Sequence, residues 1–265
     1  MRRDYLFWGL VLVLLGGLLF LNAAGVPLPG GMHALQLFWP AVLVLLGVWI
    51  LLGYFWQGAG VEGDKRTIQL QGAREASLRL NYGAGRLKLG AGASGEQFLT
   101  GTFAGIVEQK VKLVGEQLQV RLEMGPFPSF LLGGSGGAEW EVLLNREVPT
   151  SLRVETGATR SELDLSELRI TELKLSTGAS KTDLLLPARA GTTTVNIELG
   201  AASLDILVPK GVAARVRAEQ GVSAIEVDTA RFPFNNGIYE SADYSSAQNR
   251  VDIIIQAGVG RVVVR

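Results

Sequence analysis

Six glycines recur along the chain inside one flanking pattern. Apolar or small side chains stand three and five residues before each glycine, and apolar side chains stand four or six residues after it. Alternation with a period of two predicts a β-strand on each side of the glycine. The repeating unit is therefore a strand, a corner of small residues and a second strand. The glycines at these repeat corners are Gly83, Gly157, Gly178, Gly200, Gly221 and Gly258.

The four middle glycines of this set follow one another at spacings of 21, 22 and 21 residues. Such a period is short for a helical repeat and suits two or three short strands per turn. We therefore expect an all-β, β-solenoid-like domain in which the units stack on one another.

Two longer gaps between the glycines hold insertions. The first insertion, about residues 98–125, predicts a hairpin with strands at 106–114 and 117–123, joined at Gly115-Glu116. A glycine-rich loop follows it at residues 133–137. The second insertion, residues 231–249, contains the turn signal Asn235-Asn236-Gly237.

Two apolar runs, residues 6–24 and 35–56, contain no charged side chain. A helix of about 20 residues spans a hydrocarbon core about 30 Å thick, so each run is long enough to cross a bilayer. Aromatic rings favour the headgroup level, and they bracket both runs. These membrane-interface anchors are Tyr5, Trp8, Phe38, Trp39, Tyr54 and Trp56. We expect a two-helix transmembrane hairpin at 1–57, a linker at 58–66 and the β-domain at 67–265.

The charges beside the two runs predict their orientation. Arg2 and Arg3 precede the first run and Lys65 and Arg66 follow the second, whereas the connecting loop has only His33. Because positive charge stays on the cytoplasmic side, both termini are predicted to lie in the cytoplasm and the lipid bilayer is the first expected partner.

Composition argues against several classes of function. Acidic and basic residues balance at 25 each, so no basic field favours nucleic acid. The absence of cysteine excludes disulfides, cysteine-ligated zinc and thiol catalysis. The single histidine, His33, falls between the apolar runs, so the β-domain has no histidine-dependent triad. We expect a protein that is not an enzyme, with no catalytic residue, metal site or cofactor.

Four acids stand five residues after a repeat glycine: Glu162, Asp183, Asp205 and Glu226. Stacked strands are expected to bring these acids into one outward row at about 4.8 Å spacing. Like charges on neighbouring strands repel, so the row is either offset by neighbours or used to bind cations. Arg160 and Lys181 face the same way and offer the offsetting charge. A solvated face is the favoured interpretation, because the dense Asp/Asn/Gly spacing of calcium loops is absent.

The insertion at 231–249 is the candidate partner surface, because it interrupts a regular stack with aromatic side chains and an arginine. Such side chains are typical of protein interfaces. The predicted surface residues are Arg231, Phe232, Phe234, Tyr239 and Tyr244. The alternative is a cap whose aromatics cover the open end of the solenoid.

Several short motifs occur along the whole chain. They are Phe7-Trp8-Gly9-Leu10, Leu21-Asn22, Phe38-Trp39-Pro40, Leu46-Gly47, Asn81-Tyr82-Gly83-Ala84-Gly85, Thr156-Gly157-Ala158, Thr177-Gly178-Ala179-Ser180, Ala230-Arg231-Phe232-Pro233, Tyr239-Glu240-Ser241 and Asn249-Arg250-Val251-Asp252. On these residues, the N-terminal part looks like the LiaI/LiaF-type transmembrane region of bacterial cell-envelope proteins, and the remainder resembles the toast-rack domain of LiaF-like, cell-wall-active-antibiotics response proteins. The resemblance implies a multi-pass protein of the bacterial cytoplasmic membrane and, as a partner, a membrane histidine kinase of an envelope-stress system. Fuller members of the family have more than two spans.

Two hypotheses about function follow. In the first, the protein is an accessory or regulator of cell-envelope stress signalling that acts through protein contacts with a histidine kinase or another envelope protein. In the second, it is a membrane-tethered structural or adhesin-like β-solenoid scaffold that self-associates through the ends of the solenoid.

Overall fold

The computed structural model describes residues 63–125 and 139–265. The two apolar runs, all six predicted membrane anchors, most of the linker and the loop at 133–137 lie outside these ranges. Within them, no helix has the length and apolar character needed to span a bilayer. Every regular element of the described part is a β-strand, as the repeat predicts.

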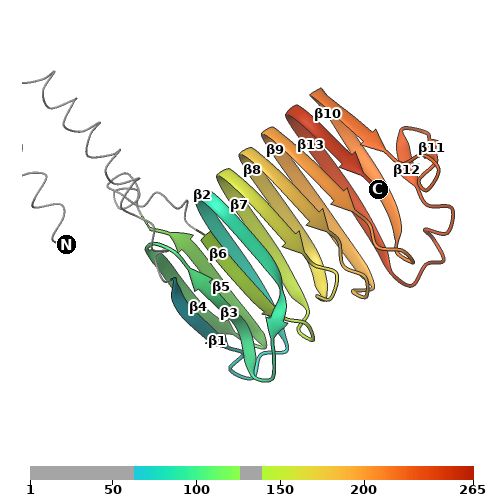
Figure 1. Ribbon diagram of the computed structural model, residues 1–265. Coiled ribbons are helices and arrows are strands. Elements are labelled where there is room, and N and C mark those ends of the chain that lie inside the picture. The colour runs from blue at the N-terminus through green and yellow to red at the C-terminus, as the bar shows by residue number, and fades with distance from the viewer. Residues whose placement is uncertain (1–62, 126–138) are drawn as a thin grey trace, which may run out of the picture. The chain divides into compact units, whose positions relative to one another are not determined.

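Thirteen strands build the described part (Figure 1). Their bounds are β1 Asp64–Gln69, β2 Glu75–Ala93, β3 Gln97–Phe103, β4 Val107–Val114, β5 Gln117–Met124, β6 Glu139–Asn145, β7 Thr150–Asp164, β8 Ile170–Leu185, β9 Thr192–Leu207, β10 Ala213–Val227, β11 Phe234–Asn235, β12 Ile238–Glu240 and β13 Arg250–Val264.

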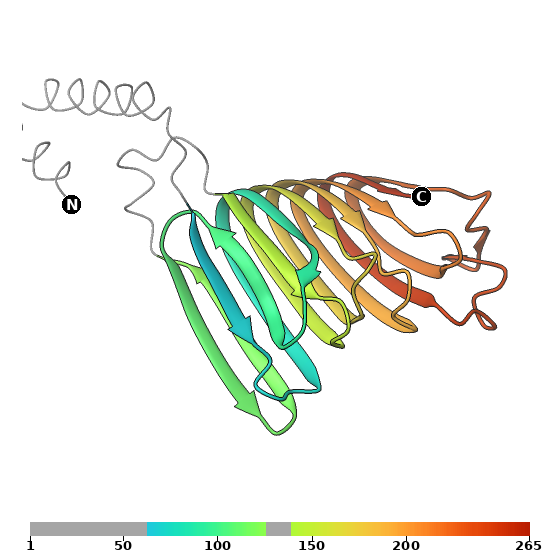
Figure 2. The ribbon, with the colours of Figure 1, turned by 60° about the horizontal axis from the view of Figure 1, so that its bottom comes forward.

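Six long strands, β2, β7, β8, β9, β13 and β10, lie parallel side by side and form the stack. Each carries one repeat glycine in its middle and arches there, so its two halves form opposite walls of the domain (Figure 2). The two strands predicted on either side of a glycine are thus one strand that continues through the bend. In β7, burial alternates up to Thr156, two exposed residues follow at Gly157 and Ala158, and burial then resumes at Thr159. This shift of one position turns both halves toward the same interior.

The core lies between the two walls and includes most of the residues predicted from the alternation. Leu152 and Val154 on the first half of β7, and Leu163 on its second half, are each at most 1% exposed. The equivalent leucines, valines and isoleucines of β2, β8, β9 and β13 are equally buried. Burial of this apolar surface on every coil is the main stabilising contribution to the stack.

Beside β2 the two walls are completed by shorter strands. The first half of β2 pairs with β5, which forms an antiparallel hairpin with β4 at the predicted position. The second half of β2 pairs with β6, followed by β3 and β1. Between these walls the indole of Trp140 packs 5.0 Å from the ring of Tyr82 and donates a hydrogen bond to the Ala104 carbonyl, 3.1 Å away. Burial raises the pKa of Tyr82 strongly.

The other end of the stack departs from chain order. The last long strand, β13, lies between β9 and β10, and β10 therefore forms the outermost coil. The 22 residues between β10 and β13 allow this crossover, and they include the small strands β11 and β12. This end of the domain holds the predicted partner surface.

Candidate interaction surface

The insertion at 231–249 builds a short hairpin on the outermost coil. β11 and β12 pair antiparallel, and β12 pairs with β10 at Arg215 and Val216. Asn236 and Gly237 form the two-residue turn with φ angles of 49° and 82°. Asparagine followed by glycine suits this turn because both residues tolerate positive φ. The turn predicted from the sequence is thus confirmed.

Arg231 and Phe232 fasten the start of this insertion to the stack. The Arg231 guanidinium donates hydrogen bonds to the carbonyl oxygens of Val208, Pro209 and Val212, the last two at 2.6 and 3.2 Å. It also lies 4.9 Å from the centre of the Phe232 ring. Phe232 itself is fully buried in the core. Because it packs inside the domain, Phe232 belongs to a cap and is not available to a partner, which corrects the partner-surface prediction at this residue.

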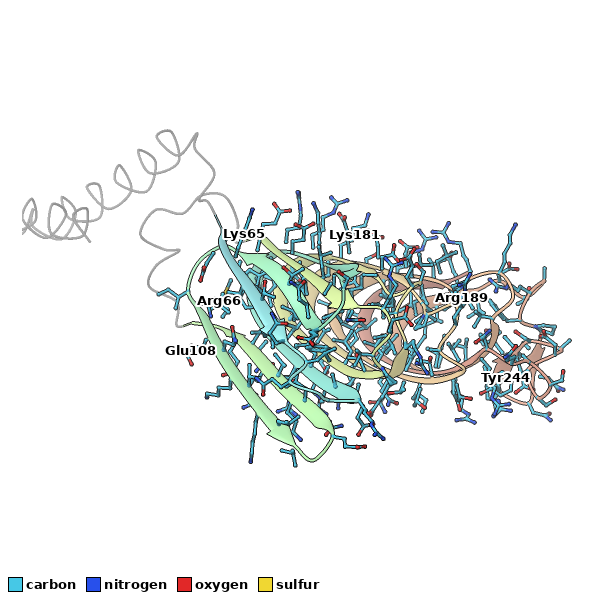
Figure 3. All side chains as sticks on the ribbon, turned by 90° about the horizontal axis from the view of Figure 1, so that it is seen from below. Lys65, Arg66, Glu108, Lys181, Arg189 and Tyr244 are labelled. Carbon is cyan, nitrogen blue, oxygen red and sulfur yellow. The ribbon has the colours of Figure 1, made fainter. Side chains whose placement is uncertain are left out.

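Tyr244 is also buried. It lies at the end of the domain opposite Lys65 and Glu108 (Figure 3). The Arg215 guanidinium lies 4.1 Å from the centre of its ring and forms an ion pair with Glu240. Burial, followed by the charge of Asp252, raises the pKa of Tyr244, and Arg215 opposes the shift. The hydrogen bond from Arg215 to Glu240 raises the pKa of the arginine, which therefore stays charged. Tyr244 is likewise part of the cap, as the alternative interpretation expected.

The sequence did not identify Arg215 and Glu240 as members of this cluster. They lie 25 residues apart and come together only because β12 folds back onto β10. Opposite charges on separate elements give no periodic signal, so only the pairing of these strands reveals the ion pair.

The exposed part of the predicted surface is therefore the hairpin tip, defined here as Phe234 and Tyr239. Phe234 is 58% exposed, and its ring centre lies 4.7 Å from that of half-buried Tyr239. The two residues are cross-strand partners in the β11–β12 ladder. A ring this exposed, fixed by a paired neighbour on an anchored hairpin, offers apolar contact area with little loss of conformational freedom on binding.

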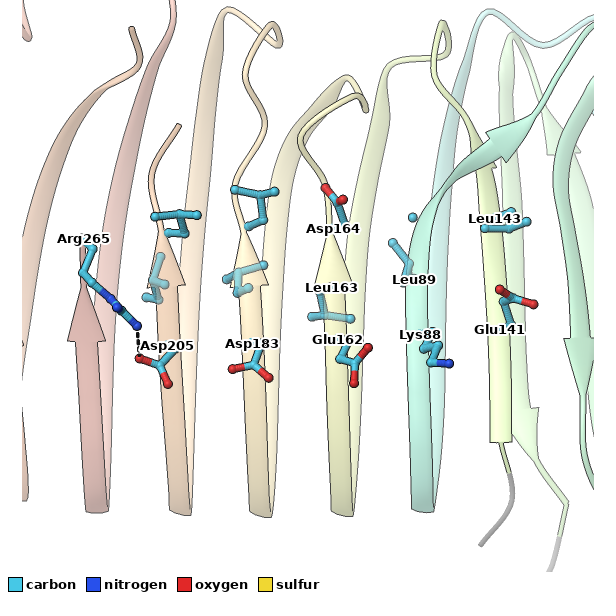
Figure 4. Close-up of a pocket in the computed structure, with 15 residues that line it drawn as sticks. Lys88, Leu89, Glu141, Leu143, Glu162, Leu163, Asp164, Asp183, Asp205 and Arg265 are labelled. Carbon is cyan, nitrogen blue, oxygen red and sulfur yellow. Dashed lines mark hydrogen bonds and ion pairs between the residues drawn. The ribbon is translucent and has the colours of Figure 1, made fainter. Parts of the chain in front are cut away.

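A second surface lies on the outer side of the second wall, where the predicted acidic row runs across the strands (Figure 4). Glu162 is the ladder partner of Asp183, and Asp183 is the partner of Asp205. Glu226 does not continue this row, because the inserted β13 places Val263 between Asp205 and Glu226. Arg265 lies 3.1 Å from Asp205, and Arg261 lies 2.7 Å from Glu226. The row therefore has three adjacent acids, of which the last is paired.

The basic residues expected to offset these acids form a row of their own. Arg160 lies between Arg86 and Lys181 in the ladder, and all three side chains are exposed. Lys181 points away from the wall (Figure 3). Neither Arg160 nor Lys181 forms an ion pair with any described residue. Their charges therefore offset the acidic row only across solvent.

An open hollow of about 520 Å³ runs beside the acidic row on this wall. Its rim combines carboxylates with the apolar side chains Leu143, Leu185 and Leu207, and Leu207 is 50% exposed. No group of three metal-ligating side chains occurs among the residues that the structure describes. The hollow is a shallow surface feature whose charged groups lie side by side and do not converge on one point.

Comparison with solved structures identifies two similar chains. A candidate cell adhesion protein from Clostridium sporogenes is 25% identical with a TM-score of 0.69, and the match covers 77% of this chain and 98% of that one. A candidate adhesin from Bacteroides fragilis is 9% identical with a TM-score of 0.31, covering 78% of this chain and 98% of that one. The second score is too low to establish a shared fold. Comparison with curated proteins gives no match.

The family comparison matches the part of the chain that holds four of the six repeat glycines, Gly83, Gly157, Gly178 and Gly200. The model of the N-terminal domain of toast_rack, DUF2154, matches residues 57–207, which is more than half of the 265-residue chain. This range covers the coils from β2 to β9 and the strands that complete the walls beside β2. The chain therefore belongs to the toast-rack family.

Proposed function

We propose that this protein is a non-enzymatic, membrane-tethered scaffold of the bacterial cell envelope, whose toast-rack domain binds other proteins. The observation that carries the proposal is the hairpin tip. Phe234 is 58% exposed on a hairpin that Arg231 and Arg215 fasten to a stack of parallel coils. A rigid scaffold that presents an exposed aromatic residue suits protein binding, because little order has to be gained on association.

The tether is the pair of apolar runs at 6–24 and 35–56. Their length, their lack of charge and their flanking aromatics support two membrane spans, and the adjacent arginines and lysine support cytoplasmic termini. Reporter fusions after Arg265 that are active on only one side of the membrane test this orientation. An external result places the domain outside the cytoplasm, where a kinase-binding role has no access to cytoplasmic domains.

The adhesion-type scaffold is supported by the match to the Clostridium sporogenes protein, which covers nearly all of that chain. The outer faces give further support, since their charges lie in rows that run across the strands and do not converge as catalytic groups do. A row-like surface suits contacts spread over a partner, whereas catalysis requires groups directed at one reacting atom.

Cross-linking in living cells tests the hairpin tip directly. The chain contains no cysteine, so Asn235→Cys introduces a single thiol next to Phe234. We expect this variant to capture a distinct envelope protein through a thiol cross-linker, and Phe234→Ala in the same background to reduce capture severalfold. Ser94→Cys, at an exposed position on the turn between β2 and β3, is the matched control and should capture little. Equal capture from both positions, or no reduction by Phe234→Ala, contradicts the proposal.

A second candidate is an accessory role in envelope-stress signalling with a membrane histidine kinase as partner. It is favoured by the likeness of both the apolar runs and the repeat corners to LiaF-like proteins. Deletion of the gene in cells that carry an envelope-stress reporter tests it. We expect altered basal or antibiotic-induced reporter activity, and unchanged activity under both conditions excludes this role.

A further inference from the structure

The outermost coil leaves most of its edge uncovered. On one side β10 pairs with β13 along its whole length. On the other side, β12 covers only Arg215 and Val216. Among the described residues, no strand pairs with this outer side of β10 from 217 to 227. An open edge of this length displays a row of unpaired backbone donors and acceptors, which favours pairing with another strand.

Hydrogen bonds at the two ends of β10 show which backbone groups point outward. The Ala213 amide donates toward β13, to the Asn249 carbonyl, whereas the Ala214 amide donates outward to the Ser241 hydroxyl. Beyond the bend, the Asp228 amide donates toward the Val264 carbonyl of β13. The backbone N–H and C=O groups of successive residues point alternately to the two edges of a strand. The backbone groups of even-numbered residues such as Ala218 therefore point to the open edge before the bend, and those of odd-numbered residues such as Ile225 point to it after the bend.

The interior at this end is incompletely covered. Ile225 and Val227 are half-buried, whereas Leu204 and Ile206 at the equivalent places of β9 are each 1% exposed. The cap covers the other half of the coil, where Val216 is fully buried. A further strand along residues 217–226 would bury the remaining apolar surface, as each coil does for its neighbour in the stack.

The edge also lacks the lysines that protect the opposite end. On the edge strand β4, Glu108, Lys110 and Lys112 are all exposed, and charged side chains there oppose strand addition. Residues 218–227 of β10 contain no lysine, arginine or proline, and their charged residues are Glu219 and Glu226.

We propose that a second copy of this chain pairs with this edge, β10 against β10, antiparallel and about a two-fold axis. In an antiparallel pair, two opposed residues either both direct their backbone groups at the partner strand or both direct them away. An even-numbered residue before the bend must therefore face an odd-numbered residue after the bend, so the numbers of two opposed residues sum to an odd value. A sum of 443 places Ala218 opposite Ile225, both on the interior side, and Arg217 opposite Glu226, both on the outer side.

This register fits the uncovered edge. It uses the ten residues 217–226 and stops where Val216 is already occupied by Tyr239 of β12. It also brings opposite charges together in two symmetry-related pairs, Arg217 with Glu226 of the second copy and the reverse. A strand bent at its centre superposes on itself when it is rotated by 180° about a two-fold axis that passes through the bend and between its two halves. The first wall of one copy therefore continues into the second wall of the other, and the reverse. The inference extends the proposed scaffold function by naming one of its partners.

The test measures the mass of the full chain in detergent by sedimentation over a range of concentrations. We expect a dimer that dissociates on dilution. Arg217→Glu and Glu226→Lys should each raise the dissociation constant about tenfold, because each places like charges together twice, and the double variant should restore dimerisation. Ile225→Pro removes an outward donor without losing a bond to β13 and should abolish the dimer. The double exchange Arg146→Glu with Glu167→Lys, at a 3.2 Å ion pair between connecting loops, is the control and should leave the mass unchanged.

A monomer at every concentration overturns the inference, as does a charge exchange that fails to restore the dimer. Failure here differs from failure of the scaffold proposal, which is judged by cross-linking from the hairpin tip in cells. A monomeric chain that still captures an envelope protein through residue 235 removes only the self-pairing.

Discussion

The backbone oxygen of Gly200 lies 2.8 Å from the place that a Cβ would occupy on Gly258. Gly178 and Gly157, and Gly200 and Gly178, meet in the same way at 3.0 Å. Each coil thus packs its bend against the carbonyl of the preceding coil, and a methyl group there would force two backbones apart. The row of glycines is a requirement of close approach between neighbouring strands.

Replacing a glycine of this row by alanine should therefore lower the free energy of unfolding by an amount that depends on its position. Gly258→Ala is expected to lower the free energy of unfolding by about 1–3 kcal/mol, since backbone must shift to admit the methyl group. Gly83→Ala is the matched control. Its Cβ would meet only the Met124 sulfur at 3.5 Å, because no bend precedes it in the row. Chemical unfolding of both variants measures the difference, and equal losses would contradict the packing argument.

Removal of the Arg231 guanidinium should loosen the cap. Arg231→Met removes one donor from each of the carbonyls of Val208, Pro209 and Val212, of which Pro209 keeps the Val212 amide, and we expect a loss of about 2–3 kcal/mol in the free energy of unfolding. Arg189→Met, at an exposed position between β8 and β9, should change stability little. Thermal unfolding of the two variants is the measurement, and a similar small change in both would show that the cap does not depend on these bonds.

The free energy of unfolding should fall in alkaline solution, and ionisation of Tyr244 should contribute to this fall. Burial raises its pKa above the ordinary value of 10.0, so the unfolded chain loses the phenol proton at lower pH than the folded chain does. The contribution is complete below about pH 10 and is lost as pH rises toward the folded pKa. Tyr244→Phe should make the decline shallower, and Tyr82→Phe should do so more strongly because its shift is larger. Unfolding curves between pH 8 and pH 11 test the order, and parallel curves for all three proteins would contradict it.

A buried hydroxyl in the fourth place after Gly178 should be dispensable. Thr182 is 1% exposed, and its Oγ1 has no hydrogen-bond partner among the described residues. Thr182→Val keeps the shape and removes the unsatisfied group, so we expect a gain of about 1 kcal/mol. At the equivalent place of β7, the Ser161 hydroxyl lies 3.2 Å from that of Thr159, and Ser161→Ala should give no gain. Comparison of the two variants by chemical unfolding decides the point.

Neutralising the middle of the acidic row should stabilise the stack. Asp183 has an acid as its ladder partner on both sides, and Asp183→Asn is expected to raise stability by about 0.2–1 kcal/mol at low salt. The gain should shrink at high ionic strength, since the groups face solvent. Asp205→Asn is the contrast, because Asp205 has Arg265 at 3.1 Å and its loss should give no gain. Unfolding of both at two salt concentrations is the test.

The coil architecture could be predicted from the sequence because it depends on local periodicity. The spacing along the sequence from Gly157 is enough to predict the burial of Leu152, Val154 and Leu163. The order of the coils carries no such signal. β10 and β13 have the same flanking pattern around Gly221 and Gly258, so local periodicity does not tell which of them lies next to β9, and the structure places β13 there. The interruption of the acidic row by Val263 follows from that choice.

The candidate surface also combines a feature that the local sequence predicts with features that depend on packing. The Asn236-Gly237 turn was predictable because it depends on the two residues that form it. Whether the neighbouring aromatics point inward or outward depends on how the hairpin packs on β10. Phe232 enters the core, Tyr244 packs beneath Arg215, and Phe234 remains outside, although all three are aromatic residues of the same insertion.

The position of β13 between β9 and β10 sets the timing of assembly. β10 emerges from the ribosome earlier, but its place beside β9 is taken in the finished domain by a strand made later. Only after residues 250–264 are synthesised can the outermost coil and its cap reach their final neighbours. Shortening the chain before residue 250 should therefore remove the β13 coil and leave β10 without its neighbour, and a growing chain must keep its unpaired β10 from premature contacts until β13 arrives.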